Sequence, residues 1–451
     1  MRHGRTGDLR RLAPALERPR ILPLQPPGRL RPPFPPARHQ GRSSPPTEPL
    51  RTAGFAGSLA IVGDEPYLPY DRPPLSKDVL TAQNPTQLTA LPLPDGLDAR
   101  WQLGRPAVRL EPRARTVTLA DGTRLPYDAV VIATGSAART WPARRPPLPR
   151  GVLTLRGWQD AIALRAELAP GRRLAVIGAG FLGGEIAAAA RARGVNVTLI
   201  ESAGQPVERA VGTVAGRFVA TMHREAGIDL RTHTTVRGFL ATDDGRITGV
   251  RLSDHSELPV DAAVLSLGAV PATEWLADSG LALEGGVRCD AYLRALLPDG
   301  TAVPGAVAAG DVTRVPHPLA GGAPVTLGHW THAVEQAASA AHTLLHPDEP
   351  EPFSAIPSFW SDLHGARIRS VGLPGLADET RIAEHELVGE RSLEVSYHKE
   401  GHLIGALTIG RTRRLAAYQR DLQAFRVATS CGTPASAPGS PRPLHGTTPE
   451  G

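Results

Sequence analysis

The chain has 451 residues, of which 41% are hydrophobic and 21% charged, values typical of a globular protein with two or three domains. No apolar run approaches the roughly 18 to 20 residues of a membrane span, and no early apolar core marks a secretory signal, so we expect a cytoplasmic protein without membrane association. The formal net charge of the chain is +6, but the first 55 residues alone carry +8, which leaves −2 for the rest. The remaining chain is therefore nearly neutral, and nucleic-acid binding is not expected.

The first 55 residues form an Arg/Pro-rich leader with twelve prolines in its first 50 positions. Proline removes backbone donors, and the segment has neither helical nor strand periodicity, so we expect disorder there. The abrupt change in composition between Pro49 and Ser58 leads to the hypothesis that the leader reflects a shifted reading frame or a misassigned start.

From Ser58 onward, apolar strands alternate with helices, which is typical of α/β folds. We expect strands at 59–62, 130–133, 174–178, 195–200, 262–267 and 303–309. After Pro352 the pattern changes to shorter amphipathic strands, at 392–397 and 403–409, with a closing helix at 415–425. Residues 428–451 are rich in Pro, Ser, Gly and Thr and are expected to form a loose tail.

The strongest chemical motif is the sequence GAGFLG at 178–183, which follows an apolar strand and opens an Ala-rich helix. Gly178 allows the tight turn, Gly180 lets the backbone approach a pyrophosphate, and Gly183 lets the helix pack close to the strand. Glu201 ends the return strand, near the roughly 20-residue spacing of a ribose-binding carboxylate. That carboxylate favours NADH over NADPH, although Arg209 lies nearby. The alternative interpretation is a strand–helix turn that binds no ligand.

The stretch VGDEPYLPYDRPPLSK at 62–77 resembles the segment after the second strand of the flavin domain in FAD-dependent ferredoxin, rubredoxin and putidaredoxin reductases. Further matches to that family follow in order over most of residues 57–425: Val108, Ala133-Thr134-Gly135, Gly310-Asp311, His329-Trp330-Thr331 and Phe359-Trp360-Ser361-Asp362.

This resemblance implies an α/β fold with two Rossmann-like dinucleotide-binding domains, for FAD and NAD, and a small α+β C-terminal interface domain. The implied FAD-binding domain has two parts, at 56–150 and 272–350. Residues 151–271 would bind NAD, and residues 351–427 would form the interface domain.

The resemblance also implies roles for individual residues. Within the pair Asp64-Glu65 lies the group that contacts the adenosine ribose of FAD, and Arg72 and Lys77 approach the flavin. The other expected cofactor-binding residues are Val108, Ala133, Thr134, Gly135, Gly268, Gly310, Asp311 and Trp330. Each of three residues also has an ordinary interpretation when it is taken alone. Lys77 could be a surface lysine, Asp311 a helix N-cap and Trp330 a core residue.

Glu185 matches the family's glutamate near the junction of nicotinamide and flavin. We expect it to pair with Lys77 across the two nucleotide units. The alternative is a carboxylate stabilised by the helix dipole.

The family pattern breaks at two places. The family begins with an apolar strand, a GxGxxG turn and a helix, and none of these three elements is evident before residue 59. The leader at 1–55 stands in their place, so loss of FAD affinity is expected. At Gly328 the family usually has Glu.

The activity implied by the resemblance is hydride transfer from NADH to FAD, followed by release of single electrons to a ferredoxin or similar iron–sulfur protein that serves an oxygenase. Alternatives are a related NADH-oxidising flavoprotein that reduces oxygen or a quinone, and a non-catalytic remnant without FAD. An Arg-rich nucleic-acid binder rests on the leader alone. The two cysteines, Cys289 and Cys431, form no CxxC pair, so neither a redox disulfide nor a metal site is expected.

Overall fold

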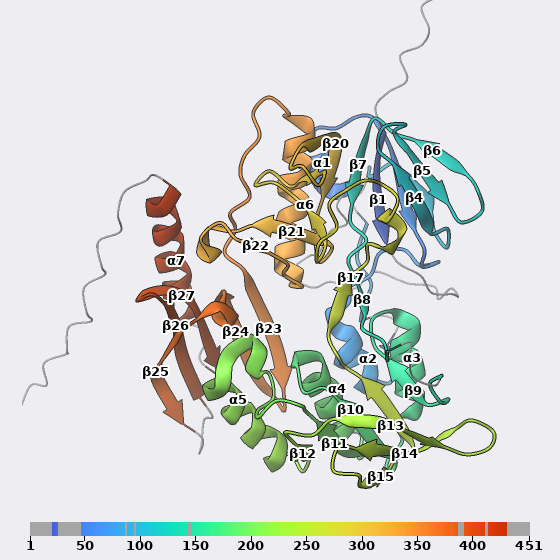
Figure 1. Ribbon diagram of the computed structural model, residues 1–451, viewed down its shortest axis with the longest axis vertical. Helices are drawn as coiled ribbons and strands as arrows, with labels where there is room; N and C mark the ends of the chain where they lie inside the picture. Colours follow the sequence, from blue (N-terminus) through green and yellow to red (C-terminus); the bar gives the residue numbers. More distant parts are fainter. Residues whose placement is uncertain are drawn as a thin grey trace, which may run out of the picture.

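The computed structural model describes residues 20–25, 47–85, 88–93, 96–142, 147–386, 392–410 and 414–430. Figure 1 shows one sheet-based unit at the top of the molecule, a second unit below it, and a C-terminal sheet beside them. The chain passes from the upper unit to the lower one and back before it enters the C-terminal sheet.

The upper unit is built on a six-stranded sheet in which only the edge strand β19 is antiparallel to its neighbour. Its strands in spatial order are β19 (Arg294–Leu296), β20 (Ala302–Ala308), β7 (Ala129–Ile132), β1 (Arg20–Gln25), β2 (Ser58–Gly63) and β3 (Ala99–Gln102). The core of this unit joins the sheet to helices α1 (Thr47–Thr52) and α6 (Trp330–Leu345) and to the antiparallel strands β4 (Ala107–Glu111), β5 (Thr116–Leu119) and β6 (Arg124–Pro126).

The prediction that no strand precedes residue 59 was wrong. Arg20–Gln25 forms β1, which pairs in parallel with both β2 and β7, so that Ile21 lies opposite Leu59 on one side and Ala129 on the other. The neighbouring strands β2 and β7 offer backbone partners on both sides of this segment. This tertiary context outweighs the weak local preference for a strand, although Pro23 has no N–H to donate to the ladder. The predicted disorder also fails at α1, where Leu50 is fully buried in the core.

The lower unit has a five-stranded, fully parallel sheet. Its strands in spatial order are β12 (Asp229–Arg231), β11 (Asn196–Ile200), β10 (Arg173–Ile177), β16 (Ala262–Leu265) and β9 (Val152–Thr154). Helices α3 (Trp158–Glu167), α4 (Phe181–Ala192) and α5 (Glu208–Glu225) accompany it, as does the antiparallel sheet of β13 (Val236–Ala241), β14 (Ile247–Leu252) and β15 (Glu257–Pro259). The alanines of α4 are mostly buried, which lets the helix lie close to the sheet.

Two antiparallel strands, β8 (Ser136–Ala138) and β17 (Ala269–Pro271), carry the chain between the two units. The upper unit is completed by β18 (Val287–Arg288), β21 (Thr313–Pro316) and β22 (Pro324–Val325). Between β2 and β3 lie a short 3₁₀ helix, η1 (Pro73–Ser76), and helix α2 (Asp78–Thr81), which packs against α3 and α4 of the lower unit.

The C-terminal unit is a five-stranded antiparallel sheet with one helix, α7 (Leu415–Ser430). Its strands in spatial order are β23 (Ser358–Leu363), β24 (Ala366–Gly372), β27 (His402–Ile409), β26 (Ser392–Lys399) and β25 (Glu379–Glu386). The tail predicted at 428–451 begins within α7, because the helix continues to Ser430; residues 431–451 lie outside the described residues.

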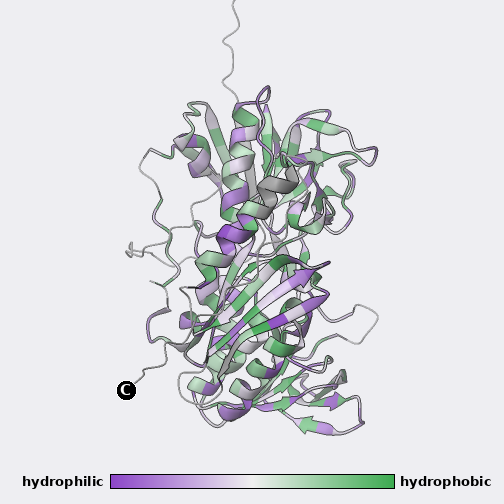
Figure 2. Cartoon of the chain, turned by 90° about the vertical axis from the view of Figure 1, so that its left-hand side faces the viewer, coloured by the Kyte–Doolittle hydropathy of each residue, from purple (hydrophilic) through white to green (hydrophobic). Residues whose placement is uncertain are grey.

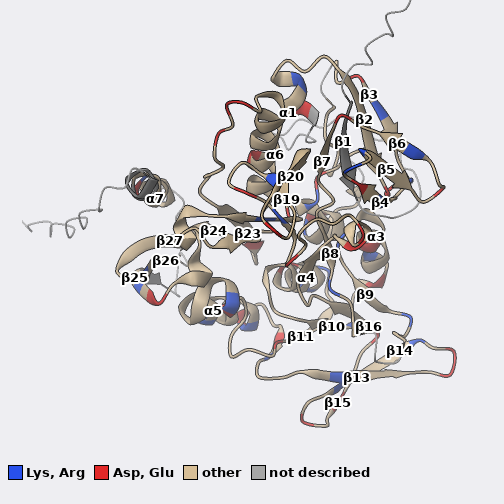
Figure 3. Ribbon diagram, turned by 45° about the horizontal axis from the view of Figure 1, so that its top comes forward, with Lys and Arg blue, Asp and Glu red and all other residues tan. Residues whose placement is uncertain are grey.

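The predicted strands at 59–62, 130–133, 174–178, 195–200, 262–267 and 303–309 are confirmed as β2, β7, β10, β11, β16 and β20, with ends that differ by one or two residues. The helices in Figure 2 carry hydrophilic as well as hydrophobic residues, and no described helix is long and apolar enough to cross a bilayer. Basic and acidic residues are scattered over all three units (Figure 3).

Candidate functional site

A cavity of about 540 Å³ lies where the three units meet. The upper unit contributes the loop and 3₁₀ helix at 69–77, the carboxyl ends of β7 and β20 and the first turn of α6. The lower unit contributes the first turns of α4, and the C-terminal sheet contributes β23. Ligands of parallel α/β sheets bind at the carboxyl ends of the strands, which is where this cavity opens.

An ion pair between the two nucleotide units forms part of the cavity wall. Lys77, which follows η1, places its Nζ 2.8 Å from Oε1 of Glu185 on α4. The Ser76 hydroxyl donates to Oε2 at 2.5 Å, and the Ser361 hydroxyl of β23 donates to Oε1 at 2.6 Å. The Glu185 side chain is only 7% exposed, and a buried carboxylate is costly unless it is paired. Here three donors from two other units of the fold stabilise it.

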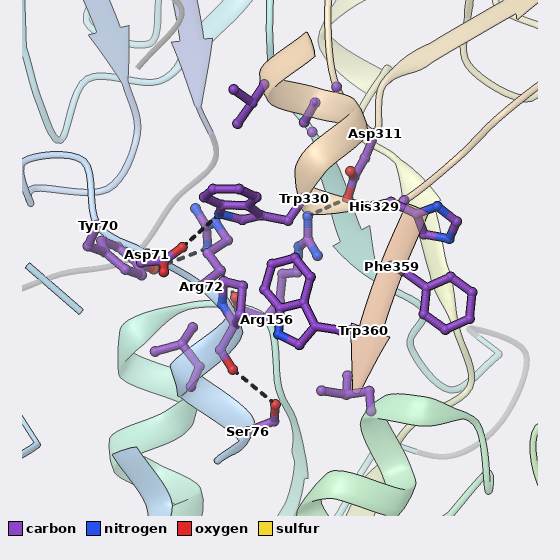
Figure 4. Close-up of a pocket in the computed structure, with 18 of the residues that line it drawn as sticks. Tyr70, Asp71, Arg72, Ser76, Arg156, Asp311, His329, Trp330, Phe359 and Trp360 are labelled. Carbon is purple, nitrogen blue, oxygen red and sulfur yellow. Dashed lines mark hydrogen bonds and ion pairs between the residues drawn. The ribbon is translucent and has the colours of Figure 1, made fainter. Parts of the chain in front are cut away.

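A second charged group lining the cavity is the pair of Asp311 and Arg156 (Figure 4). Asp311, just after β20, accepts from a guanidinium nitrogen of Arg156 at 2.8 Å and from the Ser136 hydroxyl at 2.9 Å. Arg156 also donates to the carbonyl of Ser136. The carboxylate that the sequence pointed to is therefore fixed in place by Ser136 of the linking strand β8 and by Arg156, which follows β9.

Aromatic side chains supply the apolar surface of the cavity. Trp330 begins α6, and its indole nitrogen donates to Asp71 at 2.8 Å. Its ring meets that of Trp360 on β23 edge to face, with centroids 5.7 Å apart (Figure 4). The rings of Phe359 and His329 lie 4.9 Å apart between centroids, tilted by 40°. Flat apolar walls with a few polar groups suit a planar heteroaromatic ring.

Arg72 lines the cavity, but its described bonds go to protein groups. Its guanidinium donates to Glu65 at 2.6 Å, to the Tyr70 hydroxyl at 3.1 Å and to the carbonyl of Arg156 at 3.0 Å. Glu65 is buried, and it also accepts from Tyr70. These contacts hold the loop at 69–77 in its shape, and they leave Asp64 as the better candidate of the acidic pair for a ribose contact.

Asp64 follows β2 and has one buried carboxyl oxygen without a hydrogen-bond partner. Burial, reinforced by the neighbouring charge of Glu65 and opposed by Arg72, raises the pKa of this carboxyl to about 8. A buried acceptor without a partner is costly, and a sugar hydroxyl would satisfy it.

In the glycine-rich loop of the lower unit, two of the three glycines are crowded by backbone atoms and one is open. A Cβ at Gly178, whose φ is +104°, would lie 2.2 Å from the carbonyl oxygen of Ser266, and a Cβ at Gly183 would lie 2.0 Å from that of Gly178. A Cβ at Gly180 would meet nothing within 4 Å. Space is therefore open at the second glycine alone, where a dinucleotide pyrophosphate approaches the backbone, and the residues present fit NADH.

Glu201 follows β11 at the mouth of this loop. Its carboxylate accepts from the backbone N–H groups of Ala179 and Ala203, both at 2.8 Å. The contact with Ala179 ties the carboxylate to the glycine-rich turn itself, the position from which a ribose hydroxyl would be bound.

The profile of the pyridine nucleotide-disulphide oxidoreductases matches residues 48–337, and a profile described as reductase C-terminal matches residues 358–430. The chain belongs to the pyridine nucleotide-disulphide oxidoreductase family. The resemblance to ferredoxin and putidaredoxin reductases is thereby confirmed, together with the α/β fold of two nucleotide units and a C-terminal domain.

Two curated relatives and one solved structure illustrate the similarity. Rhodocoxin reductase of Rhodococcus erythropolis is 37% identical over 328 residues, which cover 72% of this chain and 74% of that protein. The ferredoxin–NAD(+) reductase component of the anthranilate 1,2-dioxygenase system of Burkholderia cepacia is 34% identical over 372 residues, or 80% of this chain and 87% of that protein. The covalent complex of putidaredoxin reductase with putidaredoxin aligns with a TM-score of 0.77 at 26% identity, covering 91% of this chain and 93% of that chain.

The cavity brings together about half of the residues that the sequence singled out. Those that line it are Arg72, Lys77, Ala133, Gly135, Glu185, Gly310, Asp311 and Trp330. Those that do not line it are Asp64, Glu65, Val108, Thr134, Gly178, Gly180, Gly183, Glu201 and Gly268. Two of the second group have evident structural roles, because the Thr134 hydroxyl donates to the carbonyl of Ala272 and the carbonyl of Gly268 accepts from Arg139, both beside the β8–β17 link.

FAD, the flavin that the family implies, fits one half of its expected site. The cavity offers the size, the aromatic walls and the polar groups that an isoalloxazine ring needs. The half that would bind the ADP portion keeps Asp64 and the exposed Val108, but the sequence between β1 and α1 contains no GxGxxG. The cofactor-binding roles of the individual residues therefore stay predictions.

Sequence reasoning missed four polar groups of the site: Asp71, Ser76, Arg156 and Ser361. Three of them lie inside the stretches that carried the family resemblance, so their position was signalled but not their role. Arg156 had no local signal, because it lies 155 positions from Asp311 and meets it only in the folded chain. Cys289 is buried, which raises the pKa of its thiol, and Cys431 lies outside the described residues, so the absence of a redox disulfide stays a prediction.

Proposed function

We propose that this protein is an NADH-dependent flavoprotein reductase that delivers electrons to a ferredoxin or similar iron–sulfur protein serving an oxygenase. The observation that carries the proposal is the ion pair between the partly buried Lys77 and the buried Glu185, which joins the two nucleotide units at the wall of the central cavity. The relatives named above are reductases of this kind, in dioxygenase and rhodocoxin systems.

Each part of the reaction assigns a task to residues of this chain. The open space at Gly180 and the carboxylate of Glu201 would hold the pyrophosphate and ribose of NADH, with the helix α4 directing its amide groups at the phosphates. Bound FAD supplies the capacity to take two electrons together and release them singly. Trp330 and Asp311 would bound its ring on the side of the upper unit.

The Lys77 ammonium lies in the wall of this cavity and keeps its charge balanced by Glu185. A fixed positive charge beside a ring that gains negative charge stabilises that charge without reorganisation, which is the usual way in which a buried site favours electron transfer. Since the reductant is NADH, we place the protein in the cytoplasm.

Purified protein supplied with FAD tests the proposal through NADH-dependent reduction of a [2Fe–2S] ferredoxin. The chain has two lysines, Lys77 and Lys399, and the second lies at the end of β26, away from the cavity. We expect Lys77→Met to slow the reaction by about tenfold or more, since one charge-assisted contact is lost, and Lys399→Met to leave it unchanged. Equal effects of both substitutions would contradict the proposal.

The missing glycine motif favours a second candidate, a protein of this family that binds NADH but retains no FAD. The visible spectrum of the protein after incubation with FAD and removal of free flavin separates the two. A yellow protein supports the reductase, and a colourless protein that still binds NADH supports the second candidate.

A further inference from the structure

The Glu185 carboxylate is held by donors from two directions. Lys77 and Ser76 reach it from the upper unit, and the third donor, Ser361, comes from the C-terminal sheet. Oε1 accepts from both Lys77 and Ser361, so the lysine and the serine share one oxygen. The C-terminal sheet therefore contacts the very atom that pairs with the lysine of the cavity.

The strand β23 presents Ser361 with little freedom to move. Phe359 and Trp360 line the cavity, while the next residue, Ser361, is fully buried, with its hydroxyl on Glu185 of the lower unit. The strand packs closely on α4, because a Cβ added at Gly184 would lie 3.3 Å from the Leu363 side chain. Such a close approach fixes the distance between the serine and the helix that carries Glu185.

A second cavity, of about 800 Å³, lies beside the contact between Ser361 and Glu185. Lys77 and Glu185 line it as well as the central cavity, so the ion pair lies between the two spaces. The second cavity is lined by exposed charged side chains such as Arg191 and Arg367. Without Ser361, the Glu185 carboxylate keeps only the two donors of the upper unit, Ser76 and Lys77, and we expect it to turn toward this space together with Lys77.

We propose that Ser361 is a positioning residue for hydride transfer: its hydroxyl holds the Glu185 carboxylate so that Lys77 stays directed at the central cavity. The inference rests on the proposed function, since it assigns a task within that reaction. It also gives the C-terminal sheet a part in the chemistry of the two nucleotide units, beyond its contribution to the cavity wall.

The chain offers a matched control in Ser370 of β24. This serine is equally buried, at 1% exposure, and its hydroxyl donates to the carbonyl of Ala406 within the C-terminal sheet. Ser361→Ala and Ser370→Ala each remove one buried hydroxyl from the same sheet. Only the first removes a contact with Glu185.

The first measurement needs no flavin chemistry. Protein made with lysine labelled with ¹³C at Cε has two lysine signals in an NMR spectrum, and Lys399 serves as the internal reference. We expect Ser361→Ala to shift the Lys77 signal, whereas Ser370→Ala leaves both signals in place. An unshifted Lys77 signal in Ser361→Ala overturns the inference.

The second measurement is the rate at which NADH reduces the FAD-loaded protein under anaerobic mixing. Losing one hydrogen bond to a charged group predicts a rate lower by about tenfold to a hundredfold in Ser361→Ala. We expect the Kd of NADH to stay within about twofold of the parent value, because the Ser361 hydroxyl contacts Glu185 and neither Gly180 nor Glu201, to which the NADH contacts are assigned. In a Glu185→Gln background, adding Ser361→Ala should lower the rate by less than about threefold, since the two residues act through one contact.

The outcomes separate the two proposals. A parent protein that holds FAD but is not reduced by NADH overturns the proposed function and, with it, this inference. A parent protein that is reduced by NADH, together with equal rates for Ser361→Ala and Ser370→Ala, overturns the inference alone.

Discussion

The three glycines of the loop at 178–183 allow the NADH site to be tested separately from the stability of the fold. In Gly180→Ala the new methyl group meets no other heavy atom within 4 Å, and the backbone φ of −68° is open to any residue. We therefore expect the free energy of unfolding to change by no more than about 0.5 kcal/mol. The methyl group would occupy the space through which a pyrophosphate reaches the backbone. Losing one hydrogen bond to a charged phosphate costs about 1.5–3 kcal/mol, or about 10- to 150-fold in the Kd of NADH.

Gly183→Ala should behave in the opposite way. Its methyl group would lie 2.0 Å from the carbonyl oxygen of Gly178, an overlap that only a shift of the helix or the turn can relieve. We expect a loss of about 1–3 kcal/mol in the free energy of unfolding, as for overpacking in a core.

Gly238→Ala, on β13, is the control, because its methyl group also meets nothing within 4 Å and the position lies outside the loop. Urea unfolding and the fluorescence of bound NADH measure the two quantities for all three variants. An unchanged Kd of NADH in Gly180→Ala would refute the assignment of this loop to the pyrophosphate.

Three further predictions concern the flavin half of the site and the response to pH. Burial raises the pKa of Asp64 to about 8 in the free protein, and ribose hydroxyls favour the ionised form. The affinity for FAD should therefore rise with pH up to about 8, by at most tenfold per pH unit, and Asp64→Asn should flatten this dependence in a fluorescence titration; an equal slope in both proteins would count against Asp64. The lack of a first GxGxxG predicts that FAD binds this protein less than about tenfold more tightly than FMN; a preference of several orders of magnitude would show that another segment replaces the motif. Burial lowers the pKa of His223 and of His332 to about 3, and neither nitrogen of the His332 ring has a hydrogen-bond partner. Both histidines stabilise the fold while neutral, so the free energy of unfolding should fall by about 1.4 kcal/mol per pH unit for each histidine as the pH drops from about 6.5 toward 3. His332→Phe should reduce that slope by about 1.4 kcal/mol per pH unit in urea unfolding, and an unchanged slope would show that the acid sensitivity arises elsewhere.

The sequence predicted the lower unit well because its signals are local. The apolar strand at 174–178, the glycine-rich turn and the Ala-rich helix are contiguous in the chain, and each requires only its neighbours to be recognised. The ordered stretch at 62–77 likewise placed Lys77 and pointed to Glu185 as its partner, although the two are far apart in the chain.

The failures share a physical cause, which is dependence on tertiary partners. Arg20–Gln25 lacks the composition of a central strand, and it becomes one because β2 and β7 offer backbone partners on both sides. Ser361 and Arg156 lie in strands or loops that give no sign of the carboxylates they contact. Such contacts are set by the packing of three units, which no local pattern contains.

The proposed function requires above all that NADH and a flavin meet beside Lys77 and Glu185. Anaerobic titration of the FAD-loaded protein with NADH, followed by the visible absorbance of the flavin, tests this claim directly. We expect one equivalent of NADH to bleach the flavin absorbance completely, and we expect slower bleaching in Glu185→Gln with the flavin still bound. A protein that binds both nucleotides but shows no bleaching would contradict the proposed function.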